Sequence, residues 1–370
     1  MKQRVNLAAP DPGLLGAIIV LIIAGIVLVY DASYATLGDS GQSCWGMVRK
    51  QAIFGCVGLA GMLIAMRVSF RFTRKWLDLA VGISFVLLVL VLIPGIGVKA
   101  HGARSWFRIG PVSVQPSEIV KITIVVLLAA GLSRARVFAR RRPRLWVGPL
   151  LIACALIGLI ALESDLGTAG VTVGTCFVMF FAAGARKRYL SGAVLVMFVL
   201  GALAMKYEPH VKVRVEAFRN PWKDQYVGGF QTVHSLIALG TGGLTGQGWC
   251  EGREKLYLPE QDTDYIFSST VGEELGLMGT IGLLGLFGFV VYRGLDIARR
   301  CKSAYGILLA VGLTTMIGLQ AIVNIAVVTN SIPATGIPLP FISSGGTSLV
   351  SMMIAAGLLL SVSRQVNVES

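Results

Sequence analysis

Charged residues are scarce in this chain, and polar stretches of domain length are absent from its sequence. Only 14% of its 370 residues are charged, against about 25% in an ordinary soluble domain. Although the net charge is +14, no polar domain exists to carry a nucleic-acid-binding surface. Internal repeats and low-complexity tracts are also lacking, which weakens a prediction of an inverted-repeat transporter. These absences exclude an ordinary soluble protein.

The six cysteines do not form a metal-binding pattern, because their spacings match no ligand motif. Cys56, Cys154 and Cys176 lie within apolar runs, where cysteine behaves as a small apolar residue. Cys44 and Cys250 both lie in segments predicted below to be external. A disulfide between these two is therefore left open.

Long apolar runs are what the chain has in abundance. The hydrophobic share is 55% and the mean hydropathy is +0.74, and a helix needs about 20 apolar residues to cross a bilayer. The sequence predicts one all-α, polytopic membrane domain over residues 1–370. Ten transmembrane helices are expected at approximately residues 14–31, 50–67, 76–95, 117–133, 147–163, 167–184, 189–206, 268–292, 305–329 and 346–363. The fifth and sixth runs are nearly fused at residues 163–165, so the count is open by one.

The basic residues predict the orientation, because cytoplasmic loops of membrane proteins carry an excess of Lys and Arg. With the N-terminus in the cytoplasm, most of the 33 Lys and Arg residues fall in cytoplasmic loops. The acidic residues gather mainly in the external loops. Both termini are therefore predicted to be cytoplasmic, and the net charge is chiefly a signal of topology, with attraction to anionic lipid as a secondary effect.

Two of the predicted external loops are long. Residues 96–116 join the third and fourth spans, and residues 207–267 join the seventh and eighth. The second loop is far longer than an ordinary connection, which indicates a function. Within it, residues 230–239 have helical apolar spacing and predict a short amphipathic helix on the membrane surface. The glycine-rich residues 240–248 lack the ending of a phosphate-binding loop and are interpreted as a flexible, turn-rich connector.

Ionisable residues inside predicted spans are costly, so each is a candidate functional residue. Lys121 lies about one turn into the fourth span and needs a carboxylate partner to keep its proton. That partner is either Glu118, three residues earlier on the same helix face, or Glu208 at the outer end of the seventh span. Glu273, in the eighth span, either faces a cavity or caps the entry to the span.

Three carboxylates stand at the predicted border of water and membrane, just before the eighth span. Glu260, Asp262 and Asp264 can act there as a general base or as ligands of a divalent cation such as Mg²⁺ or Mn²⁺. The alternative is an ordinary acidic loop in which Asp264 caps the next helix.

Arg104 and Trp106 lie in the shorter external loop. An interfacial tryptophan usually anchors a protein at the lipid headgroups. A guanidinium also binds phosphate as a fork, and an indole stacks on a sugar ring. The pair therefore also suits a lipid-linked pyrophosphate that carries a sugar.

Five motifs in the same order resemble the SEDS family, the bacterial glycosyltransferases that include FtsW, RodA and SpoVE and polymerise lipid II into peptidoglycan strands. The resemblance covers essentially the whole chain. The motifs are GARSW at 102–106 followed by QPSE at 115–118 and Lys121, DLGT at 165–168, NPW at 220–222, LPEQDTDYIF at 258–267 and TGIPLPFISSGG at 335–346.

The resemblance assigns roles to individual residues. Asp264 matches the essential aspartate of the family. Lys121 and Glu208, with Glu118 nearby, match a pair that couples the fourth span to the seventh. The residues expected to contact substrate are Lys50, Arg104, Trp106, Arg214, Glu260 and Asp262.

Three positions depart from the family pattern. Asp262 replaces a histidine, and this change either repels the charge of Asp264 or creates a better cation site. Lys50 replaces an arginine, which exchanges a forked donor for a point charge. Ser344 replaces a tyrosine near the end of the chain.

The function implied by the resemblance is lipid II polymerisation at the outer face of the bacterial plasma membrane. The NPW and TGIPLPFISSGG motifs favour FtsW or SpoVE over RodA, and hence a role in cell division. The implied partner is a class B penicillin-binding protein, a transpeptidase, because this chain has no cross-linking domain. A lipid II flippase and a non-catalytic scaffold of the division machinery remain as alternatives.

Overall fold

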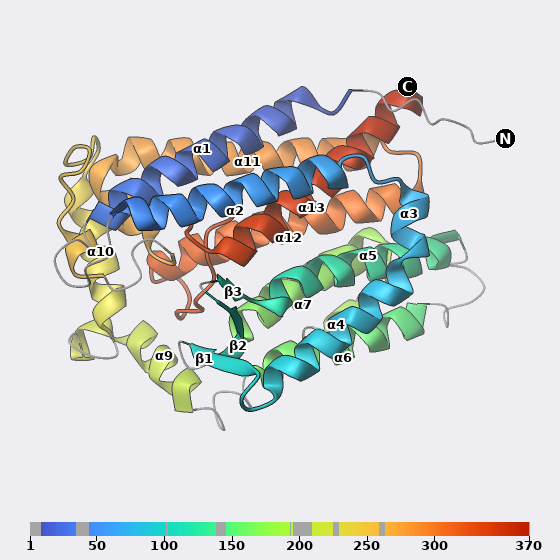
Figure 1. Cartoon of the computed structure of the whole chain (residues 1–370), viewed down its shortest axis with the longest axis horizontal. Coiled ribbons are helices and arrows are strands. Elements are labelled where there is room, and N and C mark those ends of the chain that lie inside the picture. The colour runs from blue at the N-terminus through green and yellow to red at the C-terminus, as the bar shows by residue number, and fades with distance from the viewer. Residues whose placement is uncertain are drawn as a thin grey trace.

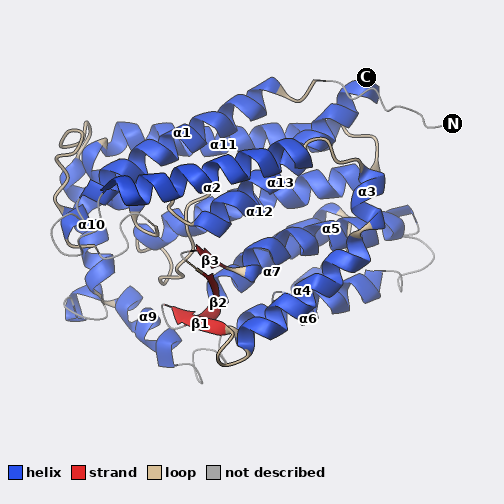
Figure 2. Cartoon of the chain, in the orientation of Figure 1, coloured by secondary structure: helices blue, strands red, loops and turns tan. Residues whose placement is uncertain are grey.

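The structure of the chain is a computed structural model, and it describes residues 9–34, 44–100, 103–110, 112–137, 146–192, 194, 209–224, 229–258 and 263–369. Long helices dominate it (Figure 2). In chain order the long helices are α1 (Pro12–Tyr34), α2 (Cys44–Ala65), α4 (Leu77–Leu92), α5 (Pro116–Val137), α6 (Val147–Leu162), α7 (Leu166–Ala182), α11 (Gly276–Arg300), α12 (Ala304–Val328) and α13 (Gly346–Glu369).

The apolar character of these helices confirms a polytopic helical membrane protein. Six of them, α1, α2, α5, α11, α12 and α13, contain segments long and apolar enough to cross a membrane, and α4, α6 and α7 are shorter apolar helices. Each corresponds to one predicted span. The predicted span at 189–206 lies almost entirely outside the described residues, so the count of ten stays a prediction.

The long helices run side by side along the molecule (Figure 1). Helices α5, α12 and α13 form its interior, where side chains such as Leu128, Leu313 and Leu359 are fully buried. Helices α1, α2 and α11 lie on one side of this interior and α4, α6 and α7 on the other. The outer helices expose apolar side chains, as expected for surfaces that face lipid.

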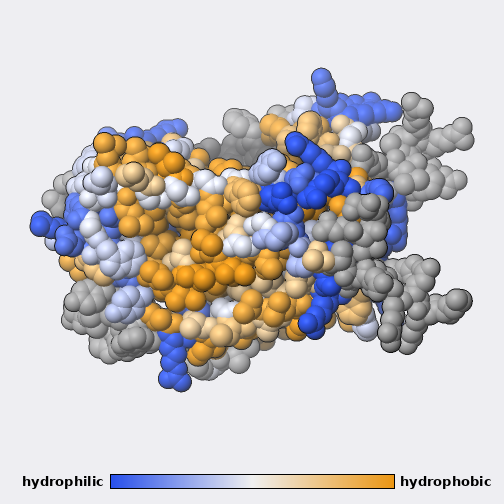
Figure 3. Space-filling model, turned by 90° about the horizontal axis from the view of Figure 1, so that it is seen from above, coloured by the Kyte–Doolittle hydropathy of each residue, from blue (hydrophilic) through white to orange (hydrophobic). Residues whose placement is uncertain are grey.

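The two ends of the bundle differ in charge. The start of α1 meets the end of α13, where the backbone N–H of Asp11 donates to Ser363 Oγ at 3.1 Å. This end also carries Arg67, Lys75 and Arg188. A broad apolar band covers the middle of the face shown in Figure 3, with hydrophilic residues toward both ends. The basic end is therefore the one that the positive-inside rule assigns to the cytoplasm.

The opposite end contains a small sheet that the sequence analysis did not predict. Strands β1 (Gly97–Ala100), β2 (Ala103–Ile109) and β3 (Val112–Val114) pair antiparallel in the order β1-β2-β3 and connect α4 to α5. The register places Trp106 opposite Val98 and Phe107 opposite Val114. Gly110, with φ of +62°, turns the chain between β2 and β3. The sheet holds the predicted substrate residues Arg104 and Trp106 on a rigid strand.

The long external loop is also structured. It contains α9 (Pro209–Arg219), the 3₁₀ turns η3 (Pro221–Asp224) and η4 (Glu254–Leu256), and α10 (Phe230–Gly242). Helix α10 confirms the helix predicted at 230–239. It is more than a surface helix, because the buried Ser235 Oγ donates to Val328 O at 2.7 Å and lies 2.8 Å from Ser268 Oγ.

The glycine-rich segment that follows α10 is packed closely, contrary to the interpretation as a flexible connector. A Cβ on Gly246 would lie 2.0 Å from the carbonyl oxygen of Glu274. Gly246 also has φ of +83°, a conformation that side chains disfavour. A Cβ on Gly242 would lie 1.9 Å from the carbonyl oxygen of Gly272, so Gly242 and Gly246 are needed for close contact between two backbones.

Helices α2 and α13 pack closely enough to generate a stability prediction. A Cβ on Gly357 of α13 would lie 2.4 Å from the backbone oxygen of Met62 on α2. We expect Gly357→Ala to force the helices apart and to cost about 1–3 kcal/mol of stability, seen as a lower thermal unfolding temperature in detergent. Gly288→Ala is the control, because no described atom lies within 4 Å of its added Cβ. Equal unfolding temperatures for the two variants would contradict the prediction.

Candidate active site

Asp264 lies in the turn before the π-helix η5 (Phe267–Gly272), at the end of the molecule opposite the basic end. The residue is 8% exposed. Its Oδ2 lies 3.6 Å from the position that a Cβ on Gly336 would take. Gly336 has φ of +70°, so a residue without a side chain suits this position. The carboxylate therefore faces the loop between α12 and α13.

Asn324 of α12 fixes the backbone on both sides of this contact. Its buried Nδ2 donates to Asp264 O at 2.9 Å and to Ile337 O at 2.8 Å. One amide thus joins the aspartate turn to the TGIPLPF motif. Asn324 was not predicted from the sequence as a site residue, although an amide in an apolar helix is itself a signal of a hydrogen-bonded site.

The alternative role of Asp264 as a helix cap does not fit the geometry. The residue at the N-cap position of η5 is Ile266, which makes no side-chain capping bond. Asp264 precedes that position by two residues. Its placement against Gly336 is therefore not explained by helix capping.

The DLGT motif reaches the same loop from the other side. Asp165 caps α7 by accepting from the backbone N–H of Thr168 at 3.1 Å. A Cβ on Gly167 would lie 2.7 Å from the carbonyl oxygen of Thr335. The start of α7 therefore packs directly against the residues that flank Gly336.

The QPSE motif joins this cluster through Asp165. Gln115 Nε2 donates to Asp165 Oδ2 at 2.7 Å, and Ser117 Oγ donates to the same oxygen at 3.3 Å. Four sequence-distant motifs thus meet at one end of the bundle. The structure thus brings these four motifs together in space.

Lys121 forms the i,i+3 pair, which was one of its two predicted partners. Its Nζ donates to Glu118 Oε1 at 2.9 Å and to Gln320 Oε1 at 2.7 Å. Ser351 donates to the other oxygen of Glu118 at 3.0 Å, and Gln320 Nε2 donates to Pro338 O at 3.0 Å. The network ties α5, α12 and α13 to the loop beside Asp264. Glu208, the other predicted partner, lies outside the described residues.

The other predicted substrate residues differ in how exposed they are and in whether the structure describes them. Lys50 is exposed near the start of α2, and its neighbour Gln51 donates to Ile342 O at 3.3 Å. Arg214 is partly buried on α9, and Trp106 is partly buried on β2. Glu260 and Asp262 lie outside the described residues.

No cluster of three His, Cys, Asp or Glu side chains able to hold a metal ion occurs among the described residues. The predicted cation site needs Asp262, which is not among them. A divalent cation at Asp262 and Asp264 therefore stays a prediction. Cys250 has a free thiol, and the side chain of Cys44 is not among those that the structure describes.

A buried ion cluster that the sequence analysis missed holds the segment before Asp264. Lys255 Nζ donates to Asp31 Oδ1 at 2.8 Å and to Glu274 Oε1 at 2.5 Å. Burial alone would lower the pKa of Lys255, but its bonds to Asp31 and Glu274 raise the pKa above its ordinary value. The ammonium is therefore charged and fastens the external loop to α1 and to the start of α11. The isolated Asp31 at the end of an apolar run was the available signal.

Glu273 extends this anchoring. Its carboxylate accepts from the backbone N–H groups of Arg253 at 2.8 Å and Glu254 at 3.0 Å. These contacts are with the start of the 3₁₀ turn η4 and not with the entry to the eighth span, where Leu275 is the N-cap residue of α11. Burial raises the pKa of Glu273, and these backbone donors oppose that shift.

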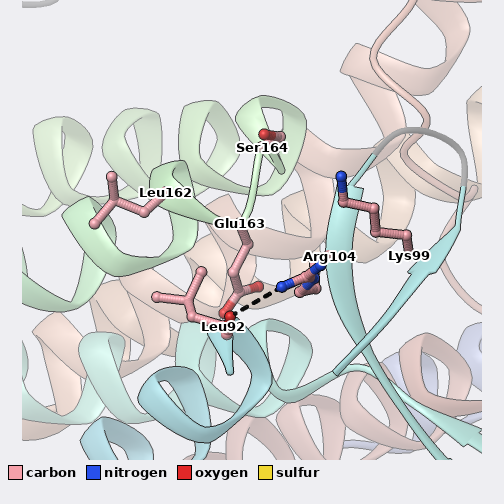
Figure 4. A pocket seen from close by; sticks show the side chains of 6 residues that line it. All are labelled: Leu92, Lys99, Arg104, Leu162, Glu163 and Ser164. Carbon is pink, nitrogen blue, oxygen red and sulfur yellow. Dashed lines mark hydrogen bonds between the residues drawn. The ribbon is translucent and has the colours of Figure 1, made fainter. Parts of the chain in front are cut away.

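Arg104 lines a cavity of about 320 Å³ with Leu92, Lys99, Leu162, Glu163 and Ser164 (Figure 4). Its Nη1 donates to Leu92 O at 3.3 Å, and its backbone N–H donates to Glu163 O at 3.0 Å. The cavity is formed where β2 meets the turn between α6 and α7. That turn leads directly into the DLGT motif.

These features define a multi-pass helical membrane protein with its polar site at one end of the bundle. The chain belongs to the FtsW/RodA/SpoVE family of cell cycle proteins, whose family model matches residues 13–368. The predicted family resemblance is therefore confirmed.

Individual relatives agree with this assignment. Stage V sporulation protein E of Bacillus subtilis is 40% identical over 96% of this chain and 97% of its own length. A probable peptidoglycan glycosyltransferase FtsW of Trichlorobacter lovleyi is 36% identical over 98% of this chain and 95% of its own length.

Two solved structures share the fold. One, from a study of a peptidoglycan synthase complex that coordinates polymerization and crosslinking, matches with a TM-score of 0.78 and 29% identity over 97% of this chain and 98% of the solved one. The crystal structure of the Thermus thermophilus rod shape determining protein RodA matches with a TM-score of 0.71 and 28% identity, over 96% of this chain and 97% of the solved one.

The Lys121 network generates a prediction. We expect Lys121→Met to destabilise the protein by about 3–5 kcal/mol, because Glu118 then stays buried without its charged partner. The double variant Lys121→Met with Glu118→Gln should recover most of that loss, since it removes both charges. Thermal unfolding in detergent measures both effects. A double variant no more stable than the single one would contradict the prediction.

Proposed function

We propose that this chain is a peptidoglycan glycosyltransferase that joins lipid II units into glycan strands at the outer face of the bacterial plasma membrane. The relatives named as peptidoglycan glycosyltransferases support the reaction class. The main structural support for the site is the position of Asp264 at the end of the bundle opposite the basic end. Asn324 binds its backbone there, and Gly336 lies beside its carboxylate.

Asp264 is the general base of the proposed reaction. Its carboxylate takes the proton from the 4-hydroxyl of the GlcNAc on the acceptor. The hydroxyl oxygen attacks the anomeric carbon of the MurNAc on the donor, and the bond from that carbon to the pyrophosphate oxygen breaks. Undecaprenyl pyrophosphate leaves, and the linkage inverts from α to β. A general base of this kind contributes about 10²–10⁴ in rate.

The leaving pyrophosphate carries negative charge that needs stabilisation. Arg104, Lys50 and Arg214 are the proposed cationic contacts, and a divalent cation at Asp262 and Asp264 is the alternative. Trp106 and Glu260 complete the proposed substrate contacts. Arg104 is the best supported of these residues, because it is held on a strand and lines a cavity.

The flippase alternative needs polar residues along a path through the membrane. Lys121 and Glu273, the ionisable residues within predicted spans, are the candidates for that path. Lys121 is 1% exposed and bonded to Glu118 and Gln320, and Glu273 is bonded to the backbone of the external loop. Since both side chains are engaged in holding the protein together, the polymerase is favoured.

The proposed partner is a class B penicillin-binding protein that cross-links the strands. The structural match to a component of a peptidoglycan synthase complex supports a partner of this kind. The sequence relatives named FtsW and SpoVE favour a role in division over side-wall growth.

The decisive test supplies lipid II to the purified chain with its partner. We expect Asp264→Asn to lower strand formation by about 10²–10⁴, because the amide cannot accept the proton. Glu251→Gln, which neutralises an exposed acid at the same end, should retain activity. Full activity of Asp264→Asn would overturn the catalytic role and favour a scaffold. Transbilayer movement of lipid II in liposomes without polymer would favour the flippase.

Dependence on the partner is a separate prediction. If the partner shifts the chain toward a competent conformation, the isolated chain should polymerise slowly and the complex faster. The measurement is the initial rate of strand formation at increasing partner concentration. A rate that does not change with the partner would remove the coupling.

A further inference from the structure

The cavity beside Arg104 contains polar groups that the protein itself leaves unpaired. Glu163 is 1% exposed, yet neither of its carboxyl oxygens has a hydrogen-bond partner in the described part of the chain. Arg104 Nε, in the wall of the same cavity, is also buried and unpaired. Leaving such groups unpaired is costly, so a cavity that gathers them suits a polar ligand.

The walls of this cavity are joined by the backbone. The N–H of Arg104 donates to Glu163 O at 3.0 Å, which fixes β2 against the end of α6. Ser164 then reverses the chain in a left-handed conformation, with φ of +64°. This turn presents Glu163 to the cavity opposite Arg104 and Lys99 (Figure 4). The two sides therefore stay in position relative to each other.

The surroundings of Glu163 favour its protonated form over the carboxylate. Burial and, secondarily, the nearby charge of Asp165 raise the pKa of Glu163 to about 8. The charged groups facing it across the cavity are Arg104 and Lys99, and neither donates a hydrogen bond to its carboxyl oxygens. The charges beyond Asp165 are those of Glu118 and Lys121, which compensate each other. A protonated carboxyl both donates and accepts a hydrogen bond.

We propose that this cavity binds a phosphate group of a membrane lipid, with Arg104 and Lys99 supplying charge and Glu163 donating a hydrogen bond from its hydroxyl. The inference rests on the proposed function and deepens it, because it adds Glu163 and Lys99 to the substrate contacts. Arg104 Nε–H and the Glu163 hydroxyl are both donors, and phosphate oxygens accept from both. A ligand that carries an ammonium group would instead be repelled by the positive charges of Arg104 and Lys99.

The rim of the cavity fits a lipid rather than a soluble phosphate. Leu92 and Leu162 border it, and Leu162 is 70% exposed on the outside of the bundle. An acyl or prenyl chain can therefore stay in the lipid while its phosphate enters. The turn that forms the cavity leads through Asp165 to Gly167, which packs against the loop that faces Asp264. The cavity and the proposed base are therefore connected through this loop.

The sign of the pH dependence follows from the role of Glu163. Below a pH of about 8 the acid is protonated and donates to the phosphate. Above that pH it becomes a carboxylate, loses the donor and repels the ligand. Two pH units of increase, from 7 to 9, remove about nine-tenths of the protonated form and should weaken binding roughly tenfold.

The test measures binding of farnesyl pyrophosphate to the full-length chain in uncharged detergent, from pH 7 to pH 9. We expect the wild type to bind about tenfold more weakly at pH 9, by the same ionisation argument. Glu163→Gln keeps a neutral donor and should retain affinity with a flat profile, which also corrects for ionisation of the ligand. Arg104→Met should lose binding, whereas Arg108→Ala, an exposed arginine on the same strand, should not. A flat profile for the wild type, or loss of binding in Glu163→Gln, would overturn the proposal.

Two further arms separate the sources of the phosphate and the two proposals. Competition by phosphatidylglycerol but not by phosphatidylcholine would identify an anionic phospholipid headgroup as an occupant. Competition by undecaprenyl pyrophosphate alone would identify the carrier lipid. Asp264→Asn should bind farnesyl pyrophosphate like the wild type, because Asp264 does not line the cavity. The binding assay therefore tests the cavity independently of strand formation.

Discussion

The outer site depends on two buried amides of α12 that hold the loop between α12 and α13. Asn324 joins that loop to the turn of Asp264, and Gln320 joins it to the Lys121 network. Within a membrane protein such irregular backbone is tolerated only where protein groups satisfy it. The loop in turn receives Gly167 of α7. Without these amides, the aspartate turn and the motifs around it would have no common support.

A second buried cluster holds the external segment that precedes Asp264. Lys255 contacts Asp31 and Glu274, and Glu273 accepts from the backbone of residues 253 and 254. Buried charges thus fix the chain both before and after the proposed base. Such clusters are costly to bury and costly to break. Their placement at the end opposite the basic residues agrees with a site that works on the outer surface.

Sequence patterns predicted most of the helices and the helix α10, because apolar length and helical spacing are local properties. They also selected Lys121, since a charge within an apolar run is conspicuous, whereas the family motifs selected Asp264 and Arg104. The small sheet around Arg104 was missed, because its strands are short and lie between polar residues. Asn324, Lys255 and Glu163 were missed as well. Asn324 and Lys255 are recognised as site residues only by their contacts with residues far away in the chain. Glu163 is recognised only by its burial without a hydrogen-bond partner.

By itself, the sequence determined a helical membrane protein of the FtsW/RodA/SpoVE family and the distribution of charge between its ends. Those properties follow from composition, apolar length and local motifs. Tertiary structure alone decided that Lys121 pairs with Glu118, that Gly336 lies against Asp264 and that Glu163 shares a cavity with Arg104. The physical reason is that pairing, burial and desolvation depend on distances between segments, which helix packing sets and which no local pattern encodes.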